Sequence, residues 1–205
     1  LAFLISKVKT TPLNTNNLDK ELSNIIQSKE YKELPKFKNI DFWFKPKVIE
    51  QLAIIKTAIN KIKDNDIKNF FLICFSETVR NTSNTRNGEF KLYRMSNKDL
   101  IKHNPYVLSE FEKIALKNIK GMKEYVKARQ KTKIIPKNYS SMEELPLSPE
   151  SVDLIVTSPP YGDSKTTVAY GQFSRLALQW LDYEDVASLD NRLLGGKASK
   201  KLEFE

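Results

Sequence analysis

Apolar residues recur at helical spacing through the first two-thirds of the chain. After Pro46 they are separated alternately by four and three positions, which places them on one face of a helix, at Val48, Leu52, Ile55, Ile59 and Ile62. A second stripe of this kind follows Pro105 and comprises Val107, Phe111, Ile114, Ile119, Met122 and Val126. The pattern predicts two long helices, each with one buried face.

Other segments are predicted to be helical as well. "LAFLISKVKT" (1–10) ends before Pro12, and another helix begins near Asn17 with carboxylates in its early turns. "DNDIKNFFLICFSETVR" (64–80) is too long for a strand, so we predict a buried helix there. Near the end of the chain, "YGQFSRLALQWLD" contains an amphipathic stripe formed by Phe173, Leu176, Ala177, Trp180 and Leu181.

Strand-like segments are short and come mainly after the helices. "EFKLYRM" (89–95) alternates apolar and polar residues, and "TKIIPKNY" (132–139) and "SVDLIVTS" (151–158) flank an acidic loop. Strands bounded by helices favour the α/β fold class, although two good strands are too few for a complete sheet.

Composition excludes several classes of protein. The chain has 205 residues and is 40% hydrophobic, enough for a packed core, yet it has no run of the about 20 apolar residues that span a membrane. Cys74 is the sole cysteine and lies in an apolar stretch, which fits a buried thiol in a reducing cytoplasm. With His103 as the sole histidine, a zinc site is not expected.

The chain is basic, with a net charge of +9. Basic chains often bind nucleic acid, because neutralised phosphates release their counterions. The lysines are spread along the whole chain, so charge alone favours nucleic acid only slightly.

The second of the two late strands runs into a polar and rigid corner, "TSPPY". Ligands of open α/β sheets bind beyond the carboxyl ends of the strands, where this corner is predicted to lie. Two prolines fix the backbone and remove two amide donors, which leaves the carbonyls of Ser158 and Pro159 without local partners. The Ser158 hydroxyl is a further acceptor, and Tyr161 offers a flat face for stacking. The set suits a planar group that bears an NH₂.

This stretch resembles motif IV of the DNA methyltransferases that modify exocyclic amines, in which Ser, Asp or Asn precedes Pro-Pro and an aromatic residue. The strand before it and the amphipathic helix after it are similar to that family too. The Ser form is typical of cytosine-N4 enzymes and is shared by some adenine-N6 enzymes. The resemblance implies a site-specific enzyme of a restriction-modification system, with S-adenosylmethionine as cofactor and double-stranded DNA as substrate.

The family's mechanism implies a role for each residue of the corner. Ser158 and the carbonyl of Pro159 would accept the amine hydrogens and aim the nitrogen lone pair at the methyl group. Pro160 would hold the loop rigid, and Tyr161 would stack on a base extruded from the duplex. Alignment of the amine with the methyl donor would supply much of the rate acceleration.

The resemblance also implies a partial Rossmann-like fold with a large helical insertion. Residues 1–30 would be a remnant of the methyltransferase core, 31–130 the insertion, and 131–205 the core segment with the motif. The Gly-rich cofactor loop of the family has no counterpart near the start of this sequence. The chain therefore looks like a fragment that a second polypeptide could complete. Asn138, or the nearby Ser140, takes the place where the family has an acidic residue near the adenine of the cofactor.

A polar and basic stretch between two long helices is a candidate for nucleic-acid binding. Arginine, lysine and asparagine suit phosphates and base edges, and the stretch contains Arg80, Asn84, Arg86, Lys91 and Arg94. An exposed, solvated loop explains the same composition about equally well. In "FWFKPK" (42–47), anchoring of the aromatic residues in the core is favoured over stacking on bases.

Two alternatives stay open. An RNA amine methyltransferase would keep the chemistry, although Asp or Asn at position 158 is more usual there. An inactive, helical nucleic-acid-binding remnant of a methyltransferase is favoured by the lack of a Gly-rich loop. His103, before Pro105, is predicted to start a helix rather than to act as a base, and Asp163 is predicted to be an ordinary loop carboxylate.

Overall fold

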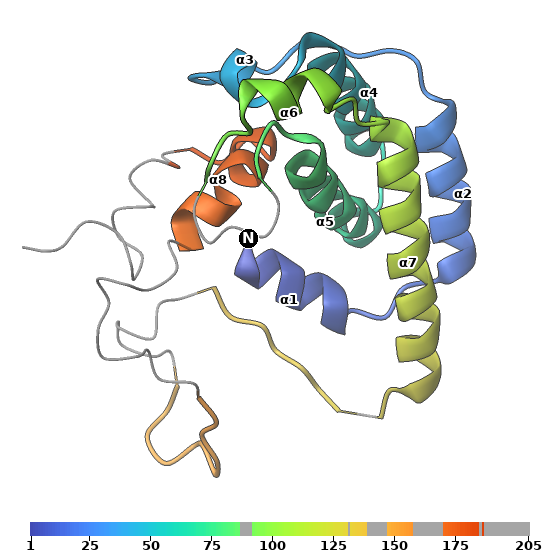
Figure 1. The fold of residues 1–205 in the computed structure, drawn as a ribbon. Helices are drawn as coiled ribbons and strands as arrows, with labels where there is room; N and C mark the ends of the chain where they lie inside the picture. Colours follow the sequence, from blue (N-terminus) through green and yellow to red (C-terminus); the bar gives the residue numbers. More distant parts are fainter. Residues whose placement is uncertain (87–91, 131, 139–146, 158–169, 185, 187–205) are drawn as a thin grey trace, which may run out of the picture.

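The computed structural model describes residues 1–86, 92–130, 132–138, 147–157, 170–184 and 186. These residues form a helical bundle (Figure 1). Its helices are α1 (Ala2–Thr10), α2 (Thr15–Gln27), α3 (Ile40–Trp43), α4 (Pro46–Asn60), α5 (Asn65–Thr82), α6 (Asn97–Lys102), α7 (Val107–Ala128) and α8 (Tyr170–Trp180).

Helix α5 is the centre of the bundle. It packs against α1, α4, α7 and α8, which surround it in Figure 1. Because it has neighbours on several sides, α5 is apolar over much of its circumference, and Phe71, Phe75 and Val79 are fully buried. The prediction of a buried helix over 64–80 is confirmed.

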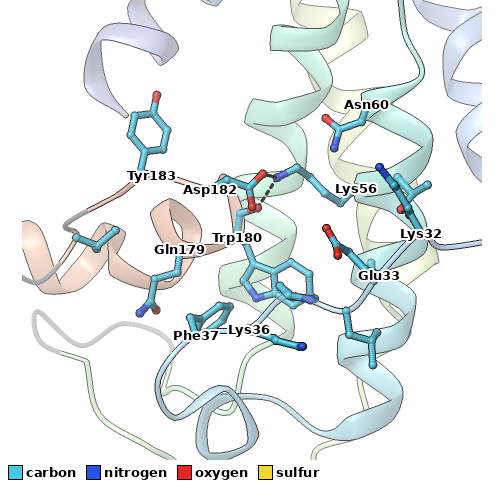
Figure 2. A pocket seen from close by; sticks show the side chains of 15 residues that line it. Lys32, Glu33, Lys36, Phe37, Lys56, Asn60, Gln179, Trp180, Asp182 and Tyr183 are labelled. Carbon is cyan, nitrogen blue, oxygen red and sulfur yellow. Dashed lines mark hydrogen bonds and ion pairs between the residues drawn. The ribbon is translucent and has the colours of Figure 1, made fainter.

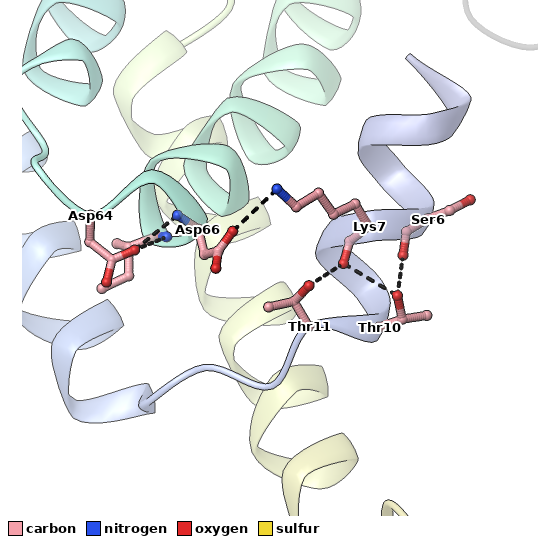
Figure 3. A network of polar contacts seen from close by, with 7 residues as sticks. Ser6, Lys7, Thr10, Thr11, Asp64 and Asp66 are labelled. Carbon is pink, nitrogen blue, oxygen red and sulfur yellow. Dashed lines mark hydrogen bonds and ion pairs between the residues drawn. The ribbon is translucent and has the colours of Figure 1, made fainter. Parts of the chain in front are cut away.

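Side-chain caps determine where several helices begin. Asp64 accepts hydrogen bonds from the backbone amides of Asp66 (2.9 Å) and Ile67 (3.0 Å) at the start of α5, as Figure 3 shows. Asn14 caps α2 and Ser96 caps α6 in the same way. Helix α4 starts at Pro46, whose missing N–H is no loss in the first turn.

Each helix predicted from the sequence is present, within a few residues of its expected ends. Helices α3 and α6 were not predicted. Helix α3 follows Asn39, which adopts the left-handed region (φ 64°) that asparagine tolerates better than most residues. It is a single turn, too short to show a periodic pattern.

The strand predictions are not confirmed among the described residues. In the described parts of the predicted strands, 92–95, 132–138 and 151–157, the sole β-type pairing is an isolated antiparallel bridge between Thr85 and Arg94. The apolar run Leu154 to Val156, expected to be buried, is 78–86% exposed. A strand is stable only beside another strand, and these segments have no such neighbour among the described residues.

One core joins the early and late parts of the bundle. The cluster of buried side chains extends from Val8 in α1 to Trp180 in α8, and α2 contributes Leu18, Leu22 and Ile25. The packing shows no break near residue 30, and the division at residues 30 and 130 stays a prediction. Among the described helices, none combines the length and apolar character needed to cross a bilayer.

Asp64→Ala is expected to lower the free energy of unfolding by about 1 kcal/mol, because two amides at the start of α5 lose their acceptor. Urea denaturation followed by circular dichroism measures the change. Asp64→Asn is the matched control, since asparagine caps helices about as well as aspartate. An equal loss in both variants would show that the charge, and not the cap, stabilises the helix.

Candidate functional site

The four motif residues, Ser158, Pro159, Pro160 and Tyr161, lie outside the described residues, as do Asp163 and Lys91. Their roles stay predictions. The described element that follows the motif in the chain is α8.

Helix α8 is anchored by its last residue, Trp180. The indole is 1% exposed and makes edge-to-face contacts with the rings of Phe37, Phe44 and Phe75, at centroid distances of 6.1, 5.7 and 5.9 Å. These rings come from the loop before α3, the end of α3 and the middle of α5. Aromatic contacts of this geometry contribute beyond the area they bury, so Trp180 joins α8 to three parts of the bundle.

A lysine from α4 holds the C-terminal end of α8. Lys56 Nζ donates to the Trp180 carbonyl oxygen (2.6 Å) and forms an ion pair with Asp182 (2.7 Å), as shown in Figure 2. Carbonyls of the last helical turn have no partner within the helix, and a cation there also interacts favourably with the helix dipole. The largely buried Lys56 therefore stabilises the end of α8.

A groove of about 900 Å³ lies beside this anchor (Figure 2). Its wall includes Lys32, Lys36 and Glu33 from the loop after α2, together with Gln179 and Trp180. Trp180 Nε1 and Gln179 Oε1 are buried without a hydrogen-bond partner among the described residues. Both residues line the groove, but these two atoms are themselves buried from solvent.

The predicted nucleic-acid-binding stretch is tied to α3. Asn84 is 3% exposed, its side-chain amide donates to the Phe42 carbonyl (3.2 Å), and its backbone amide donates to the Trp43 carbonyl (2.7 Å). Arg94 Nε also donates to the Phe42 carbonyl (2.9 Å), and its guanidinium lies 4.5 Å from the centre of the half-exposed Phe42 ring. Asn84 thus positions the stretch from within, whereas Arg94 lies closer to the surface.

The same stretch contacts α8. Arg80 stacks on Phe173, with the guanidinium carbon 3.1 Å from the ring centre, and Leu92 N lies 3.5 Å from Gln172 Oε1. Burial lowers the pKa of Arg80, and the nearby Glu77 carboxylate opposes this effect only in part. Arginine nevertheless stays charged at neutral pH. Arg80 and Leu92, at two described points of the stretch predicted to bind nucleic acid, therefore lie against the helix that follows the motif.

The remaining predicted residues are not drawn together. Arg86 is exposed, and its backbone amide donates to the Tyr93 carbonyl (2.9 Å). Asn138 is exposed in a segment without regular structure. The sequence analysis missed Lys56, for which the apolar stripe of α4 gives no signal, and it assigned Phe42 to the core, although that ring is 47% exposed.

The lone cysteine and histidine are structural among the described residues. The Cys74 thiol is buried, and burial raises its pKa, so it stays neutral at physiological pH. The His103 carbonyl accepts a hydrogen bond from Lys45 Nζ, and its ring Nε2 lies 3.5 Å from the Thr82 carbonyl. Within the described part of the chain, no group of histidine, cysteine and carboxylate side chains is placed to bind a metal ion.

Comparison with known proteins gives one informative similarity. The chain is 44% identical over 225 residues to the Type II methyltransferase M.MvaI of Kocuria varians. The match includes 98% of this chain and 50% of the relative, so the chain spans about half the length of the curated relative it matches. No family model matches the chain, and no solved structure is significantly similar to it. Since nearly the whole chain is matched, the helical bundle and the motif belong to one region of similarity.

Trp180→Ala is expected to lower the free energy of unfolding by about 3–5 kcal/mol, because it leaves a cavity among three aromatic rings. Hydrogen exchange should also show loss of protection at the α8 amides. Leu116→Ala, at a residue that is 50% exposed, is the control and should change stability by less than about 0.5 kcal/mol. Retained protection in α8 would mean that other contacts hold the helix in place.

The raised pKa of Cys74 predicts a loss of stability at alkaline pH. In the unfolded chain the thiol ionises at about pH 8.5, whereas in the folded protein burial keeps it neutral. The contribution of Cys74 to the free energy of unfolding is therefore complete below that pH. Above it, the free energy of unfolding falls by up to about 1.4 kcal/mol per pH unit. Urea unfolding between about pH 8 and 10 should show a steeper loss for the unsubstituted protein than for Cys74→Ala. Parallel curves would contradict the buried, neutral thiol.

Proposed function

We propose that this chain contains the catalytic motif of a methyltransferase that modifies an exocyclic amine in double-stranded DNA, with cytosine N4 favoured over adenine N6. The observation that supports it most is "TSPPY" after an apolar run, in a chain matched over 98% of its length by a Type II methyltransferase. The proposal includes S-adenosylmethionine as methyl donor, a place in a restriction-modification system, and the cytoplasm as compartment.

The proposed chemistry uses the four residues of the corner. An exocyclic amine is a weak nucleophile because its lone pair is delocalised into the base. Hydrogen bonds from the amine to Ser158 Oγ and to the Pro159 carbonyl would make the nitrogen more tetrahedral and orient its lone pair. Pro160 would limit the motion of the loop, and Tyr161 would hold the extruded base by stacking.

DNA contacts are proposed for the stretch that α3 and α8 support. Arg80, Arg86, Lys91 and Arg94 supply cations for phosphates and base edges. Asn84 is buried, and its side chain donates a hydrogen bond to the Phe42 carbonyl. Its proposed role is therefore to position the backbone of this stretch and not to contact DNA. The half-exposed Phe42 ring beside Arg94 adds a stacking surface.

Asn138, predicted to lie near the cofactor, is exposed and does not line the grooves of about 900, 700 and 1130 Å³. We propose that 132–138 and 151–157 become strands of an α/β sheet when neighbouring strands are supplied, by the remainder of the full-length protein or by a second polypeptide. Their exposed apolar residues, Ile134, Ile135, Leu154, Ile155 and Val156, favour this pairing.

Ser158→Ala and Tyr161→Ala in the full-length protein are each expected to reduce methyl transfer to DNA by about 10²–10³-fold, because an oriented polar contact or the stacking surface is lost. Transfer of a labelled methyl group from S-adenosylmethionine measures the rate. Ser23→Ala, at an exposed residue of α2, is the control and should retain activity. Unchanged rates in both motif variants would refute the site.

The modified nucleoside identifies the substrate. Digestion of the methylated DNA to nucleosides should release N4-methyldeoxycytidine. N6-methyladenine would retain the enzyme class and overturn the preference for cytosine. Methylation of RNA with none of DNA would favour the RNA alternative, and no transfer by the full-length protein would favour the inactive remnant.

A further inference from the structure

A second, larger groove lies on another side of α8. It has a volume of about 1130 Å³ and is lined by α1, α5, α7 and α8. Its wall includes the stacked pair of Arg80 and Phe173, and the exposed ring of Tyr106 at the start of α7. The groove therefore adjoins the helix that follows the motif.

Lysines line this groove without ion-pair partners. Lys9, Lys113 and Lys117 are exposed, and none pairs with a carboxylate among the described residues. Two other lysines of these helices form ion pairs: Lys7 of α1 with Asp66 at 3.5 Å (Figure 3), and Lys123 of α7 with Asp19 at 3.0 Å. The three groove lysines have no such partner, so they are available to an anionic ligand.

The negative charge in the groove is smaller and partly engaged. Its carboxylates are Glu77 and Glu110, and Glu110 accepts a hydrogen bond from the Asn81 amide (2.7 Å). With Arg80, the groove contains more cations than carboxylates. An anionic ligand would be attracted there, and several separated cations suit a chain of phosphates better than one small anion.

Aromatic surfaces accompany the charge. The side chain of Tyr106 is 79% exposed, and Phe173 is 39% exposed with Arg80 over one face. Stacking on another flat group would remove the exposed apolar faces of these rings from water, which is favourable. Cations that follow a backbone and aromatic rings that stack on bases are the combination by which proteins hold single strands. In a duplex the base faces are hidden, so a duplex would not use these rings.

We propose that the groove between α1, α5, α7 and α8 binds an unpaired stretch of DNA strand. Lys9, Lys113 and Lys117 contact its phosphates, and Tyr106 stacks on a base. This inference rests on the proposed function for the identity of the nucleic acid and extends it with a binding surface outside the motif. A strand opened near an extruded base is the natural occupant, because the groove shares α8 with the segment that follows the motif.

The chain offers a matched control groove. A groove of about 700 Å³ between α2, α4 and the start of α5 also contains three lysines, Lys20, Lys61 and Lys63, and two carboxylates, Glu21 and Asp64. It has no aromatic residue in its wall. Replacing the lysines of either groove changes the net charge equally, so a difference between the two triple variants reports the groove and not the total charge.

Fluorescence anisotropy with a labelled oligothymidylate, over a series of salt concentrations, tests the inference. K9Q/K113Q/K117Q should weaken binding and lower the salt slope, −d log K/d log[salt], by about 2, because each phosphate contact on a single strand contributes about 0.7. K20Q/K61Q/K63Q should leave both nearly unchanged. Tyr106→Ala should weaken binding by about five- to 150-fold, the value of one stacked base.

Several outcomes would overturn the inference. Equal effects of the two lysine triples would show non-specific attraction, and no effect of Tyr106→Ala would remove the stacking role. If a duplex of equal length binds more tightly than the single strand, and this binding depends on the same residues, the ligand of the groove is a duplex and the inference is wrong. Circular dichroism and thermal unfolding of each variant establish that the fold is intact.

The failure of this inference can be told apart from failure of the proposed function. Ser158→Ala in the full-length protein should bind the oligothymidylate normally and lose methyl transfer. Absence of methyl transfer in the unsubstituted protein, with groove-dependent binding retained, would refute the function alone. Normal methyl transfer with equal binding by the two lysine triples would refute the groove alone.

Discussion

The contact of Trp180 with Phe37, Phe44 and Phe75 is the interaction on which the arrangement around α8 depends. A helix as short as α8 is marginal alone, and its stability comes from the face that it buries. Trp180 contributes to that face together with Leu176, Ala177 and Leu178, and Lys56 completes the helix end by binding the Trp180 carbonyl. With α8 fixed, Phe173 is held beneath Arg80, and the wall of the larger groove is complete. Packing at the C-terminal end of α8 thus controls the surfaces along this helix.

The long helices were predictable because their buried residues recur at helical spacing in the sequence. Val48 to Ile62 and Val107 to Val126 show one apolar face each, and α5 was recognised by an apolar run longer than a strand. Position in the bundle was not predictable from these patterns. A stripe identifies the buried face of α8, but not that Trp180 meets rings from three segments. The single-turn helix α3 depends on the left-handed Asn39 and on tertiary hydrogen bonds, which no local pattern reveals.

The strand predictions stay unconfirmed for a different physical reason. Helical hydrogen bonds are made within a segment, whereas those of a strand are made with a neighbour. Leu154, Ile155 and Val156 have the composition of a buried strand, yet they remain exposed without a partner. The residue pattern thus indicates that the segment can form a strand, and the presence of neighbouring strands determines whether it does. The proposed sheet reconciles the two observations, since it supplies the neighbours that the described residues lack.

Charge shows the same difference between composition and arrangement. The net charge of +9 and the even spread of lysines favoured nucleic acid only slightly. Folding pairs a few of those lysines, such as Lys7 and Lys123, and places others along grooves without ion-pair partners among the described residues. A paired lysine must break its ion pair before it neutralises a phosphate, whereas an unpaired one can neutralise the phosphate directly, and the nucleic acid then releases counterions. The unpaired lysines of the larger groove stand beside exposed aromatic rings, and those of the smaller groove do not. Specific attraction for an unpaired strand therefore arises from the packing of α1 and α7 around α5 and α8, and not from the total charge of the chain.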